Sequence, residues 1–399
     1  MQNNTGLKHK KKQIFRKIFQ GGALVALQNS NGKTKESSRD TVTTEQSIWT
    51  NVPSPFRDSI KVRQPTQDNI QYQEPEPNVV IEDQSPTPVI VMAYFRSGSS
   101  FVGDIIQAHE DVFYLFEPLR PLTNRFKISN DTSPQSISRY RNNTESILTN
   151  LSRCGLNNVP RYIFQDYQFL KISKKARLYS LCVHDDINKT YDHTRACLEN
   201  LSESCVESKV MLMKVIRPSI SVLFKMMETI PKLKIIYLQR DPRAMAKSHL
   251  YFGVIKKKTE IDDVTRFCYR LNEDAMVAEK IKLKYPERIM SLFYEDVAYH
   301  PVMEAQRIYK FAGLTFGRRQ QDLITAMTTT ATQEKECRNM CTTKISSIQA
   351  EGWRQTTSFQ FVHNVDKCCK EYYQRKGYRN IPNLQLLRDL NYTLRLPDT

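Results

Sequence analysis

The sequence predicts an α/β fold in which a mainly parallel sheet is flanked by helices. Two segments carry this prediction. Residues 88–101, PVIVMAYFRSGSSF, join an apolar, β-branched run to a polar turn and the start of an amphipathic helix. Residues 209–238 give a strand, a helix and a second strand, and both strands are mostly apolar. Apolar strands that alternate with helices are typical of a parallel sheet that is covered on both faces.

Composition and charge narrow the class of ligand. The chain has 399 residues, 40% of them hydrophobic, which is enough for one large core or two modest ones. Its formal net charge of +17 suits an anionic ligand. We do not expect a nucleic acid, because the sequence has no C₂H₂ pattern, basic zipper or RNP-type aromatic signature.

Cysteines and glycosylation sequons point to a secretory lumen. The chain has nine cysteines and seven N-x-[ST] sequons, which start at Asn3, Asn130, Asn142, Asn150, Asn188, Asn200 and Asn391. No C-x-x-C pair is present, so a zinc site is not expected. Cys268 falls in a predicted helix, and a buried free thiol there would leave eight cysteines for disulfides, whose pairing stays open.

Composition also divides the chain into parts. Residues 1–27 are basic and contain a weak apolar segment, too short and glycine-rich to span a bilayer. This segment could be a poor signal sequence, an amphipathic surface helix or the remnant of an anchor. Residues 28–87 are predicted to be a disordered stem. The folded domain is predicted over 88–380, with a variable lobe of low periodicity at 123–207, and a C-terminal tail over 381–399.

The apolar runs set the order of elements within the domain. After the first strand and helix, a second apolar run ends at Glu117-Pro118, where proline stops the strand. Further strands are expected at 209–216, 233–238 and 289–294, helices at 220–227, 261–281, 302–311 and 365–376, and a loop-rich stretch at 328–349.

The turn at Arg96-Ser97-Gly98-Ser99-Ser100 is predicted to hold an anion. A strand that ends in a tight turn and a helix start directs backbone N–H groups, hydroxyls and the positive end of the helix dipole at one point. The turn is not a Walker motif, which needs a second glycine and a lysine. Its arginine can grip a phosphate through two N–H groups without a metal. The simpler alternative is a turn whose polar residues only cap the helix.

A second motif follows the strand at 233–238 and contains Arg240 and Ser248. Ligands of open α/β sheets lie at the carboxyl ends of the strands, so this motif and the first turn can face one ligand. Arg240 and Ser248 are eight residues apart and could reach the same phosphate. The alternative for Arg240-Asp241-Pro242-Arg243 is an ion pair at a helix start. Two phosphate sites on one nucleotide explain both motifs together.

Three separated stretches resemble one family in the right order. Residues 96–119, 233–248 and 291–314 are similar to the carbohydrate 6-O-sulfotransferases that act on galactose, N-acetylgalactosamine or N-acetylglucosamine, with the keratan sulfate and chondroitin type closest. The resemblance covers roughly 88–380. It implies a P-loop NTPase-like sulfotransferase fold, the donor 3′-phosphoadenosine 5′-phosphosulfate (PAPS), and a type II membrane protein of the Golgi, although no anchor is visible in the sequence.

The resemblance also implies the donor-binding residues. The 5′-phosphosulfate loop would consist of Arg96, Ser97, Gly98, Ser99 and Ser100, followed by Phe101, and the 3′-phosphate would be held by Arg240 and Ser248. A sugar hydroxyl attacks sulfur in line, and Arg96 with the loop amides stabilises the charge on the leaving phosphate. No metal is expected.

Glu117 and Lys214 are the other predicted catalytic residues. Glu117 is our choice of general base, because the distantly similar tyrosylprotein sulfotransferases have a catalytic glutamate at about this spacing. Lys214 matches a lysine of that group which serves the bridging oxygen or the sulfuryl group. A lone charge in an apolar strand also needs a use or a partner, so the alternative is a lysine paired with Glu117 or Asp241. His109 is a second candidate base, although its place near a helix end favours a surface role.

The sequence also assigns roles to other residues. The pair Asp185-Asp186 is expected to be solvated, and Glu295-Asp296 is expected to support the fold. Trp353-Arg354 matches a family pair near the nucleotide and is assigned to adenosine or substrate contacts. His249 stands where many relatives have arginine, which would weaken binding of the 3′-phosphate.

The predicted activity is transfer of sulfate to the 6-hydroxyl of Gal, GalNAc or GlcNAc in keratan sulfate, chondroitin sulfate or a related glycan or proteoglycan acceptor, in the Golgi lumen. Two alternatives remain open. One is a tyrosylprotein sulfotransferase that acts on acidic peptides. The other is a glycan-binding relative that has kept the fold and lost turnover.

Overall fold

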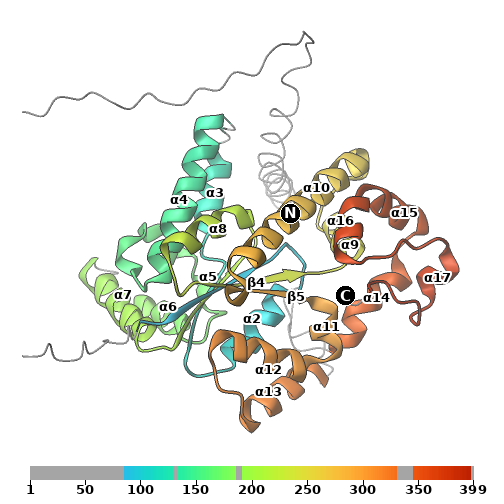
Figure 1. Cartoon of the computed structure of the whole chain (residues 1–399). Helices are drawn as coiled ribbons and strands as arrows, with labels where there is room; N and C mark the ends of the chain where they lie inside the picture. The colour runs from blue at the N-terminus through green and yellow to red at the C-terminus, as the bar shows by residue number, and fades with distance from the viewer. Residues whose placement is uncertain (1–84, 130, 132, 186–190, 330–344, 397–399) are drawn as a thin grey trace, which may run out of the picture. The chain divides into compact units, whose positions relative to one another are not determined.

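The structure, a computed structural model, describes residues 85–129, 131, 133–185, 191–329 and 345–396 (Figure 1). In this part of the chain five strands form one sheet in the order β2-β3-β1-β4-β5. All four neighbouring pairs are parallel. The strands are β1 (Thr87–Met92), β2 (Val112–Phe116), β3 (Val210–Val215), β4 (Lys234–Gln239) and β5 (Ile289–Phe293). The predicted α/β class is confirmed, and every strand ends at the same edge of the sheet.

Helices cover both faces of the sheet, because alternate strand residues point to opposite sides. On one face, Ile90 and Met92 share a core with α4 (Pro134–Ser152), α8 (Ile220–Thr229) and α10 (Glu260–Lys284). On the other, Val89 and Val91 share a core with α2 (Ser99–Gln107) and α12 (Pro301–Ala312). Figure 1 shows α8 and α10 above the strands and α2 and α12 below them. Two covered faces explain why the strands are apolar throughout.

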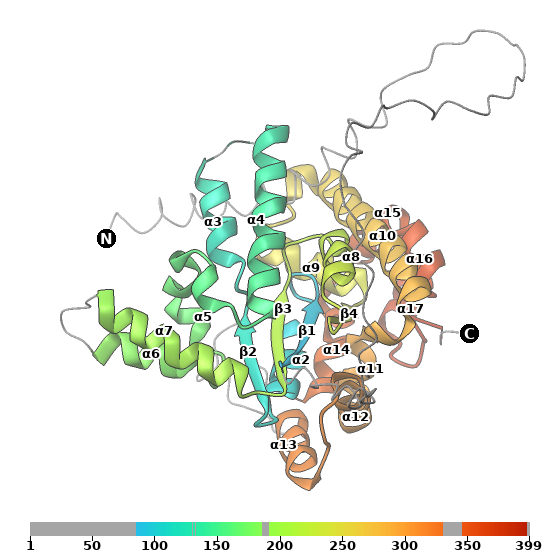
Figure 2. The same cartoon turned by 60° about the vertical axis from the view of Figure 1, so that its left-hand side comes forward.

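The predicted variable lobe is helical over most of its described residues. It contains α4 and much of α3 (Arg120–Ser129), and it continues with the short α5 (Tyr167–Leu170), α6 (Ala176–Asp185) and α7 (Tyr191–Val206). Figure 2 shows α6 and α7 as neighbours beside β2. Disulfides join Cys154 to Cys205 and Cys182 to Cys197. Covalent pairing therefore supports helices whose sequences carry little apolar periodicity.

A third disulfide corrects the prediction for Cys268. This cysteine lies in α10, as expected, but it is bonded to Cys369 and is not a free thiol. Among the described residues the free cysteine is Cys368. Cys337 and Cys341 fall at 330–344, outside the described residues.

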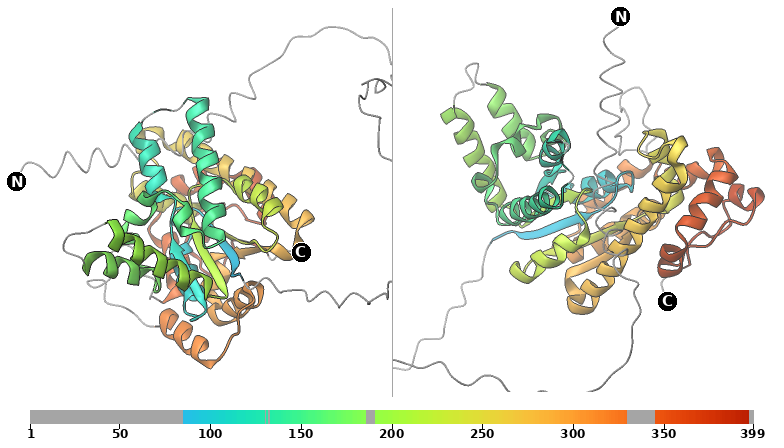
Figure 3. Two further views of the ribbon diagram at one scale, coloured as in Figure 1. Left: turned by 90° about the vertical axis from the view of Figure 1, so that its left-hand side faces the viewer. Right: turned by 90° about the horizontal axis from the view of Figure 1, so that it is seen from above.

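The C-terminal region adds a group of helices beside α10 (Figure 3). The predicted helix at 365–376 is two helices, α15 (Phe359–Cys368) and α16 (Lys370–Lys376). The predicted tail packs on the domain, since Ile381 and Leu387 are buried with Trp353. The remaining helices are α9 (Pro242–Tyr251), α11 (Tyr294–Tyr299), α13 (Arg318–Thr329), α14 (Ser346–Thr356) and α17 (Leu384–Arg388).

The predicted basic N-terminus and all but the last residues of the predicted stem lie outside the described residues. The folded domain begins with β1 at Thr87. None of the helices over the described residues combines the length and the hydrophobicity that a membrane span requires.

Candidate active site

Four neighbouring strands bring the predicted site residues to one edge of the sheet. Arg96 follows β1, Glu117 follows β2, Lys214 is the penultimate residue of β3, and Arg240 follows β4. Because the strand order is β2-β3-β1-β4, the residues run along the edge as Glu117, Lys214, Arg96 and Arg240. The edge therefore has an acidic residue at one end and arginines at the other.

The turn after β1 is braced by Ser97. Its hydroxyl donates to the carbonyl oxygen of Tyr94 at 2.9 Å and accepts from the Tyr94 amide at 3.3 Å. The Ser97 amide donates to the same carbonyl, and the residue is fully buried. The side chain of Ser97 thus shapes the turn, so its predicted part in the donor loop would fall to its backbone.

Gly98 precedes α2 as its N-cap residue, in a conformation that requires glycine. Its φ is +88°, and an added Cβ would lie 2.1 Å from the ring of Tyr294. No side chain caps the helix. The amides of its first turn, at Ser99, Ser100 and Phe101, lie beyond the reach of intrahelical acceptors and can receive an anion. The Phe101 side chain is buried against Tyr294, so Phe101 can contribute only its backbone.

Arg96, Arg240 and Ser248 lie together. Nε of Arg96 donates to Oγ of Ser248 at 3.0 Å, and Nη1 of Arg240 donates to the carbonyl oxygen of Arg96 at 2.9 Å. The Arg240 guanidinium stacks on the Tyr294 ring at 4.3 Å. Burial, and then the charge of Arg240, lower the pKa of Arg96. The structure thus brings together the two arginine motifs that the sequence predicted to face one ligand.

Glu117 is the centre of a buried ion-pair cluster. Its Oε1 accepts a hydrogen bond from Nζ of Lys214 at 2.7 Å, and its Oε2 accepts one from Nη1 of Arg217. Burial would raise the pKa of Glu117, but the charges of Arg217 and Lys214 outweigh burial and lower the pKa to about 2. Glu117 is therefore ionised at neutral pH. Lys214 is paired with Glu117 and not with Asp241, and Nζ also lies 3.5 Å from Oγ of Ser100.

Two of these residues have unusual backbone conformations. Arg96 has a φ of +69° and Glu117 a φ of +50°, a region that non-glycine residues rarely adopt. Such strain costs about 1–3 kcal/mol at each position and clusters at functional sites. Glu117 directly follows β2 and Arg96 lies in the turn between β1 and α2, where the chain must turn sharply to present each side chain at the sheet edge.

The two histidines have structural positions. The prediction of a surface role for His109 is wrong, because this residue is buried and its Nε2 lies 3.1 Å from Oγ1 of Thr315. It stands between α2 and β2, at the opposite end of the strands from Glu117. His249 is buried, and Nε2 donates to the carbonyl oxygen of Phe95 at 2.8 Å. Burial lowers the pKa of His249 to about 4, so it is a neutral support for the turn.

Trp353 and Arg354 are buried beside the C-terminal segment. Arg354 is buried, and its guanidinium donates to the carbonyl oxygens of Leu386, Leu387 and Asp389. These hydrogen bonds fix the C-terminal segment. Trp353 is buried in the same small core.

The two acidic pairs, Glu295-Asp296 and Asp185-Asp186, lie in different parts of the chain. Glu295 Oε1 accepts from the amide of Asp241 at 2.9 Å. Asp296 pairs with Arg395 at 2.6 Å. Both residues therefore support the fold, as predicted. Asp185 ends α6, and Asp186 lies outside the described residues.

Sequence reasoning missed Arg217 and Tyr294. Arg217 follows β3 by two residues, so the rule that identified Arg96 and Arg240, an arginine at a strand end, could have found it. Tyr294 follows β5, and its ring contacts both Gly98 and Arg240. Its role depends on a spatial contact that no local motif indicates.

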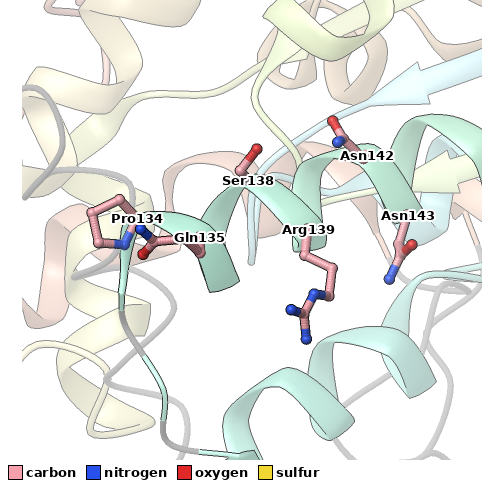
Figure 4. A pocket seen from close by; sticks show the side chains of 6 residues that line it. All are labelled: Pro134, Gln135, Ser138, Arg139, Asn142 and Asn143. Carbon is pink, nitrogen blue, oxygen red and sulfur yellow. The ribbon is translucent and has the colours of Figure 1, made fainter.

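Two hollows lie on the α3 to α5 side of the domain. A narrow cavity beside Glu117 is lined by apolar and aromatic side chains that include Phe116, Phe164 and Phe169. A shallow surface hollow runs along the exposed side of α4 (Figure 4), and its lining contains none of the predicted site residues. The narrow cavity is therefore the hollow that adjoins the candidate active site.

The known proteins that resemble this chain are sulfotransferases. The sulfotransferase domain model matches residues 86–377. Carbohydrate sulfotransferase 1 of zebrafish (Danio rerio) is 27% identical over 77% of this chain and 81% of its own length. Carbohydrate sulfotransferase 3 of Tetronarce californica is 26% identical over 77% of this chain and 76% of its own length.

A solved sulfotransferase domain from the curacin biosynthetic pathway is also similar. It has 14% identity and a TM-score of 0.42, and the match covers 72% of this chain and 97% of that one. The family match spans the whole sheet and every residue of the strand-end cluster. This chain belongs to the sulfotransferase domain family.

Proposed function

We propose that this protein transfers sulfate from PAPS to the 6-hydroxyl of galactose, N-acetylgalactosamine or N-acetylglucosamine in a glycan, by metal-free in-line displacement. The observation that carries the proposal is the edge that brings Glu117, Lys214, Arg96 and Arg240 together in a chain of the sulfotransferase family. The named relatives are carbohydrate sulfotransferases, which supports a sugar acceptor over a peptide.

In this proposal PAPS supplies the sulfuryl group and a phosphate leaving group. The arginine side of the edge holds the donor. Arg96 and the first-turn amides of α2 face the 5′ end of the donor, while Arg240 and Ser248 hold its 3′-phosphate. All are donors that are fixed before the ligand binds, so their dipoles need little reorganisation as charge develops.

The Glu117 side of the edge activates the acceptor. An ionised carboxylate can accept the proton of an attacking hydroxyl, and Glu117 stays ionised because of Lys214 and Arg217. A pKa near 2 makes it a weak base while both cations stay bound to it. Lys214 lies within 3.5 Å of the Ser100 hydroxyl, so its charge can be shared between the loop and Glu117.

A Golgi lumen location and a membrane-anchored form are part of the proposal. The three disulfides among the described residues suit an oxidising compartment.

The test offers ³⁵S-labelled PAPS and the full chain to keratan, chondroitin, a 6-deoxy sugar analogue and an acidic tyrosine peptide. We expect label in a glycan and none in the 6-deoxy analogue. Label in the peptide alone would assign the protein to the tyrosylprotein sulfotransferases. If the glycan binds but 3′-phosphoadenosine 5′-phosphate (PAP) causes no thermal shift, the protein is a glycan-binding relative without turnover.

A further inference from the structure

Asp274 is a buried acid that the proposed chemistry does not use. It lies in the middle of α10 and is about 1% exposed. Its Oδ2 accepts from the hydroxyl of Tyr94 at 3.0 Å, and its Oδ1 accepts from Oγ of Ser219 at 2.7 Å and from the amide of Ile220 at 3.1 Å. These contacts join α10 to the residues that follow β3 and to the turn that follows β1.

Arg270 lies one helical turn before Asp274 and extends the same network. Its Nε lies 3.6 Å from Oδ2 of Asp274. Its Nη2 donates to the carbonyl oxygens of Arg217 at 3.3 Å and Pro218 at 3.0 Å. The backbone of Arg217 is therefore held by α10, while its side chain holds Glu117.

We infer that Arg270 and Asp274 are positioning residues, which set the place of Glu117 through the backbone of Arg217. The inference rests on the proposed function. Both residues lie outside the three stretches that carry the family resemblance. The carbonyl oxygens of Arg217 and Pro218 would be free to move without Arg270, and the Arg217 guanidinium would then lose its fixed approach to Glu117. Misplacement of a catalytic group by about 1 Å can cost roughly 100-fold in rate.

The test is a double-mutant cycle between Arg270→Gln and Glu117→Gln. Arg270 is about one-fifth exposed, so Arg270→Gln should fold. We expect it to lower kcat about tenfold, with little change in the KM for PAPS or in Tm. If Arg270 acts through Glu117, the same change made in the Glu117→Gln background should cost less than about twofold. Equal losses in both backgrounds, or an unchanged kcat, would overturn the inference.

Asp274→Asn provides a second arm, and Glu304→Gln is the matched control. Asp274→Asn should lower kcat and also weaken PAP binding, because Tyr94 loses a charged acceptor beside the donor turn. If this variant does not fold, the double-mutant cycle between Arg270→Gln and Glu117→Gln still tests the inference.

The control residue Glu304 is an equally buried helical carboxylate, paired with Arg307 on the other face of the sheet. Its variant should change Tm without changing kcat. If the wild-type chain transfers no sulfate, the proposed function is wrong. If the wild-type chain is active but Arg270→Gln causes the same loss of kcat with and without Glu117→Gln, only this inference is wrong.

Discussion

Nζ of Lys214 lies 2.7 Å from Oε1 of Glu117 and 3.5 Å from the hydroxyl of Ser100. One ammonium group therefore connects the proposed base to the helix start that is proposed to hold the donor. An anion at that helix start would attract Lys214 and weaken its hold on Glu117, which would raise the pKa of the carboxylate. The contact couples the two halves of the site.

Glu117→Gln should lower turnover by roughly 10²–10⁴-fold, the usual range for a general base. PAP affinity should not fall, because Glu117 lies at the other end of the edge from Arg240 and its neutralisation leaves the charge of Lys214 to the donor side. Steady-state kinetics and calorimetry with PAP measure the two effects. Glu110→Gln, at an exposed carboxylate, should change neither. Full activity in Glu117→Gln would show that Glu117 is not the general base.

Arg240→Ala and Ser248→Ala should each weaken PAP binding by roughly 10- to 100-fold, because a hydrogen bond to a charged group contributes about 1.5–3 kcal/mol. Arg240→Lys should also bind PAP more weakly than wild type, since lysine cannot reproduce the stack on Tyr294 or the two N–H groups. Ser221→Ala, at an exposed serine of α8, is the control for Ser248→Ala. Wild-type affinity in both alanine variants would contradict the assignment of the 3′-phosphate.

Gly98→Ala should abolish PAP binding and lower Tm. The added Cβ would lie 2.1 Å from the Tyr294 ring, at a φ that alanine rarely adopts. Gly352→Ala is the control. This glycine lies inside α14, and no atom lies within 4 Å of the added Cβ. That variant should gain stability, by about 0.5–1 kcal/mol from helix propensity. Thermal melts with and without PAP measure both, and tight PAP binding by Gly98→Ala would show that the turn tolerates a side chain.

Stability should depend on pH through Glu295. Burial raises its pKa to about 7, above the usual value for a free glutamate. A raised carboxyl pKa means that the stabilising contribution is complete below about pH 4.5 and is lost as the pH rises through 7. Glu295→Gln keeps the oxygen that accepts from Asp241 and removes the charge. Its Tm relative to wild type should therefore be higher at pH 8 than at pH 5, and a pH-independent difference would contradict the shift.

Glycosylation can test the proposed lumenal location. Asn142, Asn200 and Asn391 are exposed sequon residues, whereas Asn150 is half-buried and its amide donates to the carbonyl oxygen of Ser146. In a glycosylating host, changing each exposed residue to glutamine should remove one glycan, seen as a smaller shift on glycosidase digestion. Asn150→Gln should leave the shift unchanged. A chain that carries no glycan would argue against passage through the secretory pathway.

The sheet and the donor side of the site were predictable because their signals are local. The run from Val89 to Met92 is apolar, and the turn after it leads into a helix, so both the strand and the candidate anion site can be read from one short stretch. Arg240 and Ser248 follow the same logic at β4. Their contact with Arg96 needed only the rule that ligands meet at the carboxyl ends of parallel strands.

The parts that the sequence did not reveal depend on contacts between distant segments. The helices of the lobe rely on disulfides such as Cys154–Cys205. Arg354 matches a family pattern, but its buried donors are used by a C-terminal segment that lacks any motif of its own. The low pKa of Glu117 depends on Arg217, which is 100 residues away in the sequence. Local patterns predict which charged and polar side chains are present, but they do not predict which distant residues pair with them.

The distances in sequence across the sheet edge have a consequence for biogenesis. Arg240 reaches the carbonyl of Arg96 over 144 residues, and Lys214 reaches Glu117 over 97. Contacts of this range close late during refolding, because long loops must be ordered first. Recovery of sulfate transfer after dilution from denaturant should therefore lag behind recovery of far-UV ellipticity, and a nascent chain released before β4 is made should be inert.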